Sequence, residues 1–200
     1  MDYPLLKKNF ENHRFHTSYF KSKEEAAAYL KENIHGELVG FGGSMTAKEM
    51  GLAEMLKEDN EVVWHWLSDM PAAEARRKAM ESTVYILSAN GVAETGELVN
   101  IDGTGNRLAA SLFGPKKVYY IIGKNKIAPD LSSAMERARN IACTKNAMRF
   151  QVKTPCVAKG GGKCYDCNSP ERICNAFLIL ERPLNGMEVE LLFVDEELGF

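Results

Sequence analysis

The stretch Glu37-Leu38-Val39-Gly40-Phe41-Gly42-Gly43-Ser44-Met45-Thr46 predicts a short buried strand that runs through a glycine turn into a helix. Its apolar run before the turn is typical of a strand buried inside a parallel sheet. Directly afterwards, Thr46-Ala47-Lys48-Glu49 has the spacing of a capping box, so Thr46 is expected to cap a helix that runs to about Leu56. The stretch therefore predicts one strand–turn–helix unit of an α/β fold.

The same alternation continues outward along the chain. Ser22-Lys23-Glu24-Glu25 is a second capping box, and Pro71 has the place that proline prefers at the start of a helix. The alternation predicts a mostly parallel sheet with helices on both faces, in one domain over residues 1–200. The expected helices cover about residues 3–12, 22–34, 46–56, 71–80, 107–112 and 130–148, and the expected strands about 37–42, 61–66, 83–88, 117–122, 177–180 and 189–194.

The glycine turn is a candidate anion-binding site. Gly42 and Gly43 let the chain turn sharply, and the free N–H groups of the following helix favour a phosphate or carboxylate. The hydroxyls of Ser44 and Thr46 can add hydrogen bonds. An ordinary strand-to-helix turn has the same composition, so both interpretations stay open at this point.

A second glycine turn, Asp102-Gly103-Thr104-Gly105-Asn106-Arg107, also leads into a helix. Asp102 could transfer a proton or bind a hydroxyl, and Arg107, Gly103 and Gly105 could hold an anion. Alternatively, Asp102 satisfies its own backbone. Because ligands of open α/β sheets bind beyond the carboxyl ends of the strands, we expect both turns to share one cleft.

Glu94 is a second candidate for acid–base chemistry. It lies between small residues, just before the glycine turn at Gly96. A buried carboxylate there could act as a general base, whereas an exposed one would be a solvated hairpin residue. Glu94 and Asp102 are therefore the candidate catalytic pair.

A segment rich in glycine and cysteine, residues 151–175, interrupts the apolar pattern and is expected to form an inserted lobe. It contains Cys156, Cys164, Cys167 and Cys174, in the spacing C-x7-C-x2-C-x6-C. Four thiolates match the coordination of zinc or of an iron–sulfur cluster, so we expect a metal centre. Reduced thiols or a redox-active C-x-x-C are the alternative, and Cys143 is expected to be a buried free thiol.

Charge and hydropathy narrow the class of protein. The formal net charge is −2, which gives no electrostatic reason to expect nucleic acid or an anionic membrane as a partner. Residues 1–15 lack the apolar core of a signal peptide, and no apolar run approaches transmembrane length. We therefore expect a cytoplasmic protein, in which clustered cysteines favour metal or redox chemistry. A homo-oligomer is also compatible with these features.

The motifs together resemble the LUD domain of lactate-utilisation proteins. Gly40 to Thr46 with Glu49-Met50-Gly51-Leu52 looks like the signature turn of that family, and Ala93-Glu94-Thr95-Gly96 and Gly103 to Arg107 match its second and third motifs. The resemblance covers about residues 1–125. It implies a fold similar to the ribose-5-phosphate isomerase and CoA-transferase superfamily, in which the loop matching Gly42 to Thr46 receives phosphate-bearing ligands.

This resemblance implies a role in oxidising lactate or a similar hydroxy acid, with an anionic, phosphorylated or CoA-like ligand at the glycine turns. Ser88-Ala89-Asn90-Gly91 is similar to the CoA-transferase motif, but Ala89 replaces its catalytic glutamate and excludes a covalent acyl-CoA mechanism there. Because lactate-utilisation operons pair this domain with iron–sulfur carriers, the resemblance favours iron at the cysteines and an iron–sulfur protein as partner, with zinc still open.

Three hypotheses follow from these residues, and they include both enzymes and non-catalytic proteins. The first is a LUD-domain protein that supports hydroxy-acid oxidation. The second is an assembly or electron-relay subunit that holds a cluster in its cysteine lobe. The third is an isomerase- or hydrolase-like enzyme that acts on a sugar phosphate through Glu94 and Asp102.

Overall fold

The computed structural model describes all residues from Met1 to Phe200. Its main sheet has six strands, and every neighbouring pair is parallel. The central strands of this sheet consist of long apolar runs, as expected for strands that are covered on both faces. In spatial order the strands are β1 (His16–Phe20), β10 (Glu188–Val194), β7 (Lys117–Gly123), β4 (Val84–Leu87), β2 (Leu38–Phe41) and β3 (Glu61–Val63).

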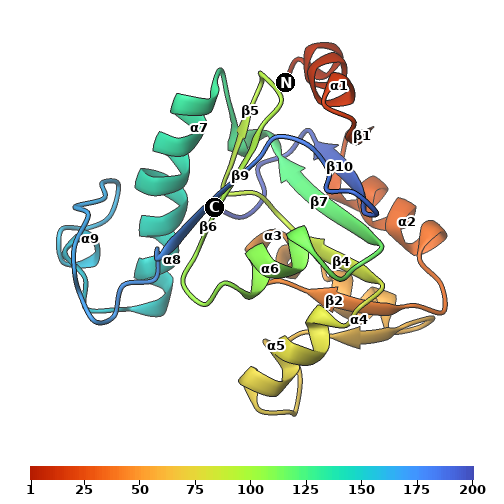
Figure 1. Ribbon diagram of the computed structural model, residues 1–200, viewed down its shortest axis with the longest axis horizontal. Helices are drawn as coiled ribbons and strands as arrows, with labels where there is room; N and C mark the ends of the chain where they lie inside the picture. Colours follow the sequence, from red (N-terminus) through yellow and green to blue (C-terminus); the bar gives the residue numbers. More distant parts are fainter.

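Helices cover both faces of the main sheet (Figure 1). One face packs on α2 (Lys23–Asn33), α3 (Met45–Glu49) and α4 (Leu52–Leu56), which contribute Ala26, Leu30, Ala47 and Leu52 to one apolar core. The other face packs on α1 (Tyr3–Asn12), α5 (Ala72–Met80) and α6 (Asn106–Leu112), in a second core. The predicted fold class, a mostly parallel sheet between helices, is confirmed.

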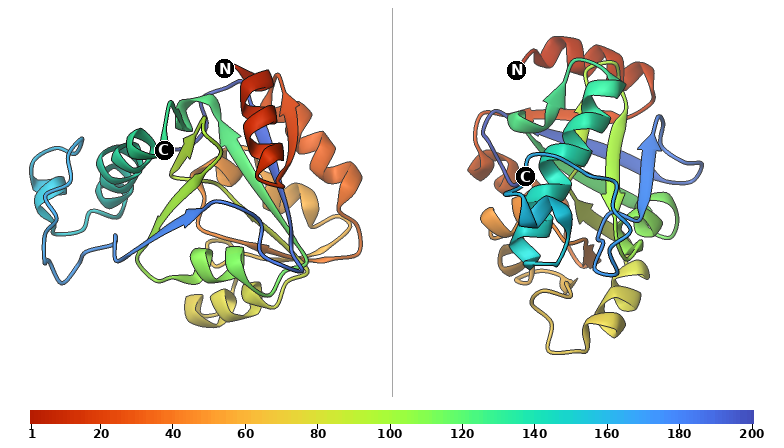
Figure 2. Two further views of the ribbon diagram at one scale, coloured as in Figure 1. Left: turned by 45° about the horizontal axis from the view of Figure 1, so that its top comes forward. Right: turned by 90° about the vertical axis from the view of Figure 1, so that its left-hand side faces the viewer.

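A second, four-stranded sheet stands beside the main one, a feature that the sequence pattern did not predict. Its strands are β8 (Ile127–Ala128), β5 (Gly91–Ala93), β6 (Leu98–Asp102) and β9 (Ala176–Leu180), with β6 antiparallel to both of its neighbours. Val92, Leu98 and Leu180 join the core of the main sheet, whereas Val99 and Ile101 pack on the long helix on the outer side. The second sheet is therefore a middle layer between the main sheet and that helix (Figure 2).

The long helix predicted at 130–148 is one continuous helical rod of three segments. It consists of α7 (Leu131–Arg137), a π-helical segment at Ala138–Ala142 and α8 (Cys143–Phe150). Asp130 caps its start by accepting the N–H of Ser133 at 2.7 Å. The rod lies at one edge of the molecule, and the chain beyond it forms the outermost part (Figure 1).

The cysteine-rich residues 151–175 have little regular structure. They contain the short helix α9 (Pro155–Ala158) and otherwise turns and extended segments that pack beside α8. The chain then returns through β9 to the second sheet. None of the helices combines the length and the apolar composition that a membrane span requires.

Several boundaries differ from the sequence prediction: the strand expected at 61–66 ends at Val63, and two differences after the first glycine turn have a local cause. The helix expected at 46–56 is two short helices, because Gly51 takes a left-handed conformation with φ of 64° and breaks the helix there. The cap of the first helix is Ser44, whose hydroxyl accepts the N–H of Ala47 at 3.2 Å. The capping box predicted with Thr46 as its cap was therefore wrong.

Candidate functional site

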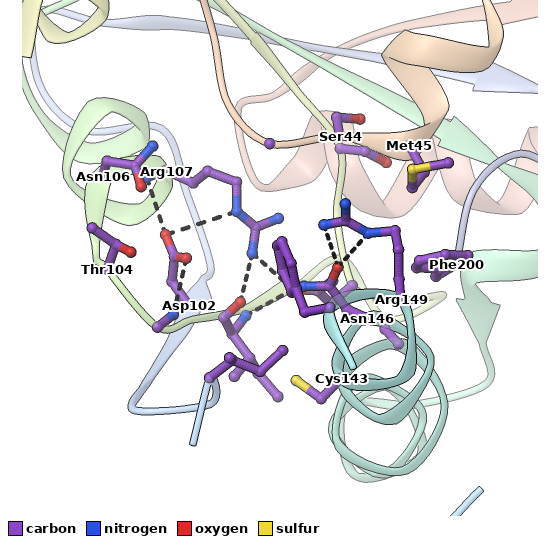
Figure 3. A pocket seen from close by; sticks show the side chains of 18 of the residues that line it. Ser44, Met45, Asp102, Thr104, Asn106, Arg107, Cys143, Asn146, Arg149 and Phe200 are labelled. Atoms are coloured by element: carbon purple, nitrogen blue, oxygen red, sulfur yellow. Dashed lines mark hydrogen bonds and ion pairs between the residues drawn. The ribbon is translucent and has the colours of Figure 1, made fainter. Parts of the chain in front are cut away.

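A cavity of about 450 Å³ lies beyond the carboxyl ends of the parallel strands. This is the edge where α/β sheets bind ligands, and the volume is in the usual range for small molecules. The turns after β2 and β4 contribute to the wall, as does the turn between β6 and α6, and α8 closes the opposite side (Figure 3). The site is therefore assembled from the main sheet, the second sheet and the long helix.

The structure brings five of the predicted residues together in this cavity. Gly43 and Ser44 line it from the first glycine turn, and Asp102, Gly103 and Arg107 line it from the second. The two turns thus share one cleft, as their positions after strands predict.

Gly42 and Gly105 belong to the same two turns but do not line the cavity. A Cβ at Gly42 would lie 2.7 Å from Cγ of Arg107, so the arginine stem covers this glycine. Gly105 adopts a φ of 89° immediately before α6, so it serves the turn itself. These two glycines were expected to contact the ligand, but neither of them faces the cavity.

Thr46 lies behind the cavity wall. It is 1% exposed, and its hydroxyl donates to the carbonyl of Leu198 at 3.3 Å and accepts from Nζ of Lys126 at 2.9 Å. Because Ser44 has taken the cap position, the Thr46 hydroxyl is free to bind Lys126. Thr46 therefore does not line the cavity, contrary to the prediction, but it contacts Lys126, which does.

Asp102 and Arg107 are held against one another at the start of α6. The carboxylate of Asp102 accepts the N–H of Gly103 at 3.0 Å and that of Arg107 at 3.1 Å, and the side chains form an ion pair at 3.7 Å. The guanidinium of Arg107 also donates to the carbonyl of Ile101 at 2.6 Å. Asp102 therefore orders the turn and holds the side chain of Arg107 in place at the cavity wall.

Glu94 lies away from this cavity. It follows β5 at the hairpin tip, whereas Asp102 ends β6 at the opposite end of the antiparallel pair. The backbone of Glu94 bonds to Ala128 and accepts a hydrogen bond from Asn9 of α1 at 2.6 Å. The prediction that Glu94 shares the cleft with Asp102 was wrong. Because β5 and β6 are antiparallel, the residue that follows β5 and the residue that ends β6 lie at opposite ends of the pair.

The cavity is strongly basic, a property that the dispersed sequence positions conceal. Asp102 is the only acidic side chain of the lining. Against it stand five basic side chains from five different segments, and sequence reasoning identified only Arg107. The five are Arg76, Arg107, Lys126, Arg149 and Arg172.

Two buried nitrogen atoms in the lining have no hydrogen-bond partner, namely Nδ1 of His65 and Nε of Arg76. Burial lowers the pKa of His65 to about 4, with the charges of Arg76 and Arg107 acting in the same direction. His65 is therefore neutral at pH 7. Since buried polar groups are normally paired, both atoms are available to a ligand. Neither residue belongs to one of the motifs in the sequence.

Aromatic rings form the wall between the first glycine turn and α8. A Cβ at Gly43 would lie 3.2 Å from the ring of Trp66, so the glycine allows the indole to approach the backbone. The guanidinium of Arg149 lies 4.8 Å from the centre of the Trp66 ring and 3.9 Å from that of Phe150. Asn146 accepts two hydrogen bonds from the same guanidinium, at 2.8 and 3.0 Å (Figure 3). Arg149 is thereby held at the cavity wall.

A second, smaller cavity of about 20 Å³ lies between α8 and the cysteine-rich segment. Its lining includes the four predicted cysteines together with Cys143. As the side chains stand, no three histidine, cysteine or acidic groups lie close enough together to hold a metal ion. Burial raises the pKa of Cys143 to about 12 and also raises the pKa of Cys174. The topology therefore brings five thiols around one small space.

The two cavities are adjacent. Cys143, Arg172 and Ile173 line both of them. In Figure 3 the sulfur of Cys143 projects from α8 near the edge of the larger cavity. The thiols thus lie directly behind one wall of the basic cavity.

Comparison with known proteins agrees with this architecture. The family model of the LUD domain matches residues 3–193. Among solved structures, a DUF162 family protein from Deinococcus radiodurans is similar over 96% of this chain and 95% of its own, with a TM-score of 0.55 and 9% sequence identity. At that identity the likeness concerns the fold alone. No curated protein matches the sequence.

Proposed function

This chain belongs to the LUD-domain family, and from that premise we propose that it binds a small organic anion, lactate or a similar hydroxy or oxo acid, in support of its oxidation. The observation that carries the proposal is the charge of the main cavity, where four arginine side chains face one acidic side chain. Such a surface favours a carboxylate or phosphate and disfavours a cation.

The arrangement of the basic groups supports binding of a small ligand. Arg107 is oriented by Asp102 and Arg149 by Asn146, so neither guanidinium loses much freedom when an anion arrives. The unpaired nitrogens of His65 and Arg76 provide further contacts. A ligand that made hydrogen bonds to these two atoms would remove the free-energy cost of burying polar groups without partners.

Calorimetric titration with lactate, pyruvate and inorganic phosphate tests this proposal. Lactamide is the matched control ligand, because it keeps the shape and the hydroxyl of lactate but lacks the negative charge. We expect lactate or pyruvate to bind at least about tenfold more tightly than lactamide, the effect of one charge-assisted contact. Equal affinities for lactate and lactamide, or no heat with any of the acids, would contradict the proposal.

A second candidate function concerns the thiols, and one observation favours it. All five cysteines of the chain line the same small cavity, although they come from widely separated positions on α8 and in residues 151–175. By donor type they suit zinc or an iron–sulfur cluster. We propose that Cys156, Cys164, Cys167 and Cys174 bind such a centre, and that an iron–sulfur protein exchanges electrons with it.

Two polar contacts to sulfur suit thiolate ligands. The backbone N–H of Asp166 donates to Sγ of Cys164 at 3.4 Å, and the hydroxyl of Thr154 lies 3.1 Å from Sγ of Cys156. Hydrogen bonds to sulfur tune metal–thiolate sites. To share one metal the four thiols must move closer together, and the largely irregular backbone of residues 151–175 can allow this movement.

The test is the metal and sulfide content of protein purified without oxygen, comparing the wild type with the Cys164→Ser, Cys167→Ser double variant. We expect iron or zinc in stoichiometric amount in the wild type and its loss in the variant. A Cys143→Ser variant is the matched control and should keep its metal. Equal, near-zero metal in all three proteins would remove the metal centre and leave the anion cavity unaffected.

A further inference from the structure

Lys126 is a buried lysine at the wall of the basic cavity. It ends the short 3-10 helix Lys124–Lys126 that follows β7, and it is only 3% exposed. Its amine donates to Oγ of Ser88 at 2.6 Å and to Oγ1 of Thr46 at 2.9 Å. Ser88 in turn donates its hydroxyl proton to the carbonyl of Ile121 at 2.5 Å. Two hydroxyl groups therefore fix the position of this amine.

The charged groups that act on Lys126 are mostly of its own sign. Arg137 of α7 and Arg107 of α6 both disfavour a positive charge on the amine, and Glu49 of α3 is the acidic group that favours one. Glu49 forms no ion pair with Lys126; its carboxylate accepts the N–H of Gly199 at 2.8 Å instead. A buried charge without a paired partner is costly. Burial, aided by the two arginines, lowers the pKa of Lys126 to about 7.

A neutral lysine amine has two N–H bonds and one lone pair. Ser88 and Thr46 accept the two N–H bonds. No donor is bonded to the nitrogen, so the lone pair is free for reaction. A desolvated lysine close to other cationic groups is the arrangement that makes this side chain nucleophilic toward carbonyl compounds.

We propose that Lys126 forms an imine with the carbonyl carbon of a small 2-oxo acid bound in the main cavity. The inference rests on the proposed function and narrows its substrate class to oxo acids such as pyruvate. Arg107 lines the same cavity, and its charge acts on Lys126, so it is placed to hold the carboxylate beside the reacting carbonyl.

The step balances without any oxidant or reductant. The lone pair of Nζ attacks the carbonyl carbon, a C–N bond forms, and one N–H proton moves to the former carbonyl oxygen to give a carbinolamine. Loss of the second N–H proton with that hydroxyl group releases water and leaves the C=N bond. The hydroxyls of Ser88 and Thr46 contact the nitrogen and can relay both protons. The imine withdraws electrons from the neighbouring carbon, which activates its bonds.

Trapping with cyanoborohydride in the presence of pyruvate tests the inference. Reduction of the imine leaves a stable 1-carboxyethyl group on the lysine nitrogen, which intact-mass measurement and peptide mapping locate. At pH 7 the neutral fraction of Lys126 is roughly 1,000-fold that of an ordinary lysine. We therefore expect Lys126 to be modified far ahead of the exposed lysines, and lactate, which has no ketone group, to give no adduct.

Variants and binding data complete the design. Lys126→Met should lose the adduct, whereas Lys124→Met, two residues away and 45% exposed, should keep it. The rate of trapping in the wild type should reach half of its maximum near pH 7. Peptide mapping of the wild-type protein decides the question even if Lys126→Met fails to fold.

Two negative outcomes are distinguishable. Calorimetric binding of pyruvate without an adduct at Lys126, or an adduct spread evenly over exposed lysines, would overturn the imine and leave the proposed function standing. No binding of any acid, together with no adduct, would overturn both.

Discussion

The guanidinium of Arg149 lies over the indole ring of Trp66, 4.8 Å from its centre. One residue is near the end of the long helix, and the other follows β3, more than eighty positions earlier in the chain. Their contact closes the cavity between α8 and the main sheet. Cation–π pairs contribute about 0.5–2 kcal/mol, and more when they are removed from water.

Replacing Arg149 with glutamine should weaken binding of lactate or pyruvate. A lost charge-assisted hydrogen bond costs about 1.5–3 kcal/mol, so we expect the Kd to rise roughly tenfold to a hundredfold. Calorimetry provides the measurement. Arg139→Gln is the matched control, because Arg139 is on the same rod but packs on Phe177 outside this cavity. An equal loss of affinity in both variants would show that net charge alone matters.

Gly43→Val should reduce anion affinity while leaving the protein folded. The new Cβ would lie 3.2 Å from the Trp66 ring, so the indole must shift and the position of Arg149 with it. The expected readout is a weaker Kd for lactate with a Tm that changes by only a few degrees. Unchanged affinity with normal folding would indicate that the position of Trp66 does not control the site.

The stability of the wild type relative to Lys126→Met should rise between pH 7 and about pH 10. The folded protein holds the pKa of Lys126 at about 7, whereas the unfolded chain has the ordinary value of 10.5. Between these values the unfolded chain binds a proton that the folded protein does not, so the unfolding free energy increases with pH. Below pH 7 both states are protonated, and this contribution stops changing.

Urea unfolding at several pH values measures this difference, since other titrating groups are common to both proteins. Lys124→Met, which removes a lysine two positions away at an exposed site, is the matched control variant. If plots of the unfolding free energy against pH run parallel for the wild type and Lys126→Met, the buried amine keeps an ordinary pKa.

Cys143 should be the slowest cysteine to react with iodoacetamide in metal-free, folded protein. Its pKa of about 12, raised by burial, leaves very little thiolate at pH 8, so we expect a rate at least roughly tenfold below that of Cys164. A quenched time course followed by mass spectrometry gives the individual rates. In guanidinium chloride the difference should vanish. Early alkylation of Cys143 in the folded protein would contradict its raised pKa.

The sequence was sufficient for the fold class because local signals and periodicity agree. Ser22 caps α2, Val84 to Leu87 form a fully buried strand, and Lys117 to Gly123 form a central one, all as the pattern predicts. The second sheet was not predictable in the same way. Its strands β5 and β8 have three and two residues, too short to produce a periodic signal.

The candidate site was only partly predictable for a related reason. Gly43, Ser44, Asp102 and Arg107 follow strands and belong to glycine turns, so local sequence marks them. Lys126, Arg149 and His65 have no such marker, because their function depends on burial and on neighbours distant in sequence. Glu94 is the opposite case. The residues around it match a motif, but Glu94 lies at the tip of the β5–β6 hairpin, at the other end of this strand pair from Asp102.

The π-helical segment at Ala138–Ala142 has a consequence for the site that follows from helical geometry alone. A π turn accommodates one residue more than an α turn, and each residue of an α-helix rotates the chain by about 100°. Deleting a single residue there would restore an ordinary helix and leave the later side chains of α8 close to their present directions, because the π turn holds the extra residue within one turn. The same deletion in the regular helix of α8 just after Ala142 would instead turn the later side chains, Asn146 and Arg149 among them, by about 100° and take them away from the cavity.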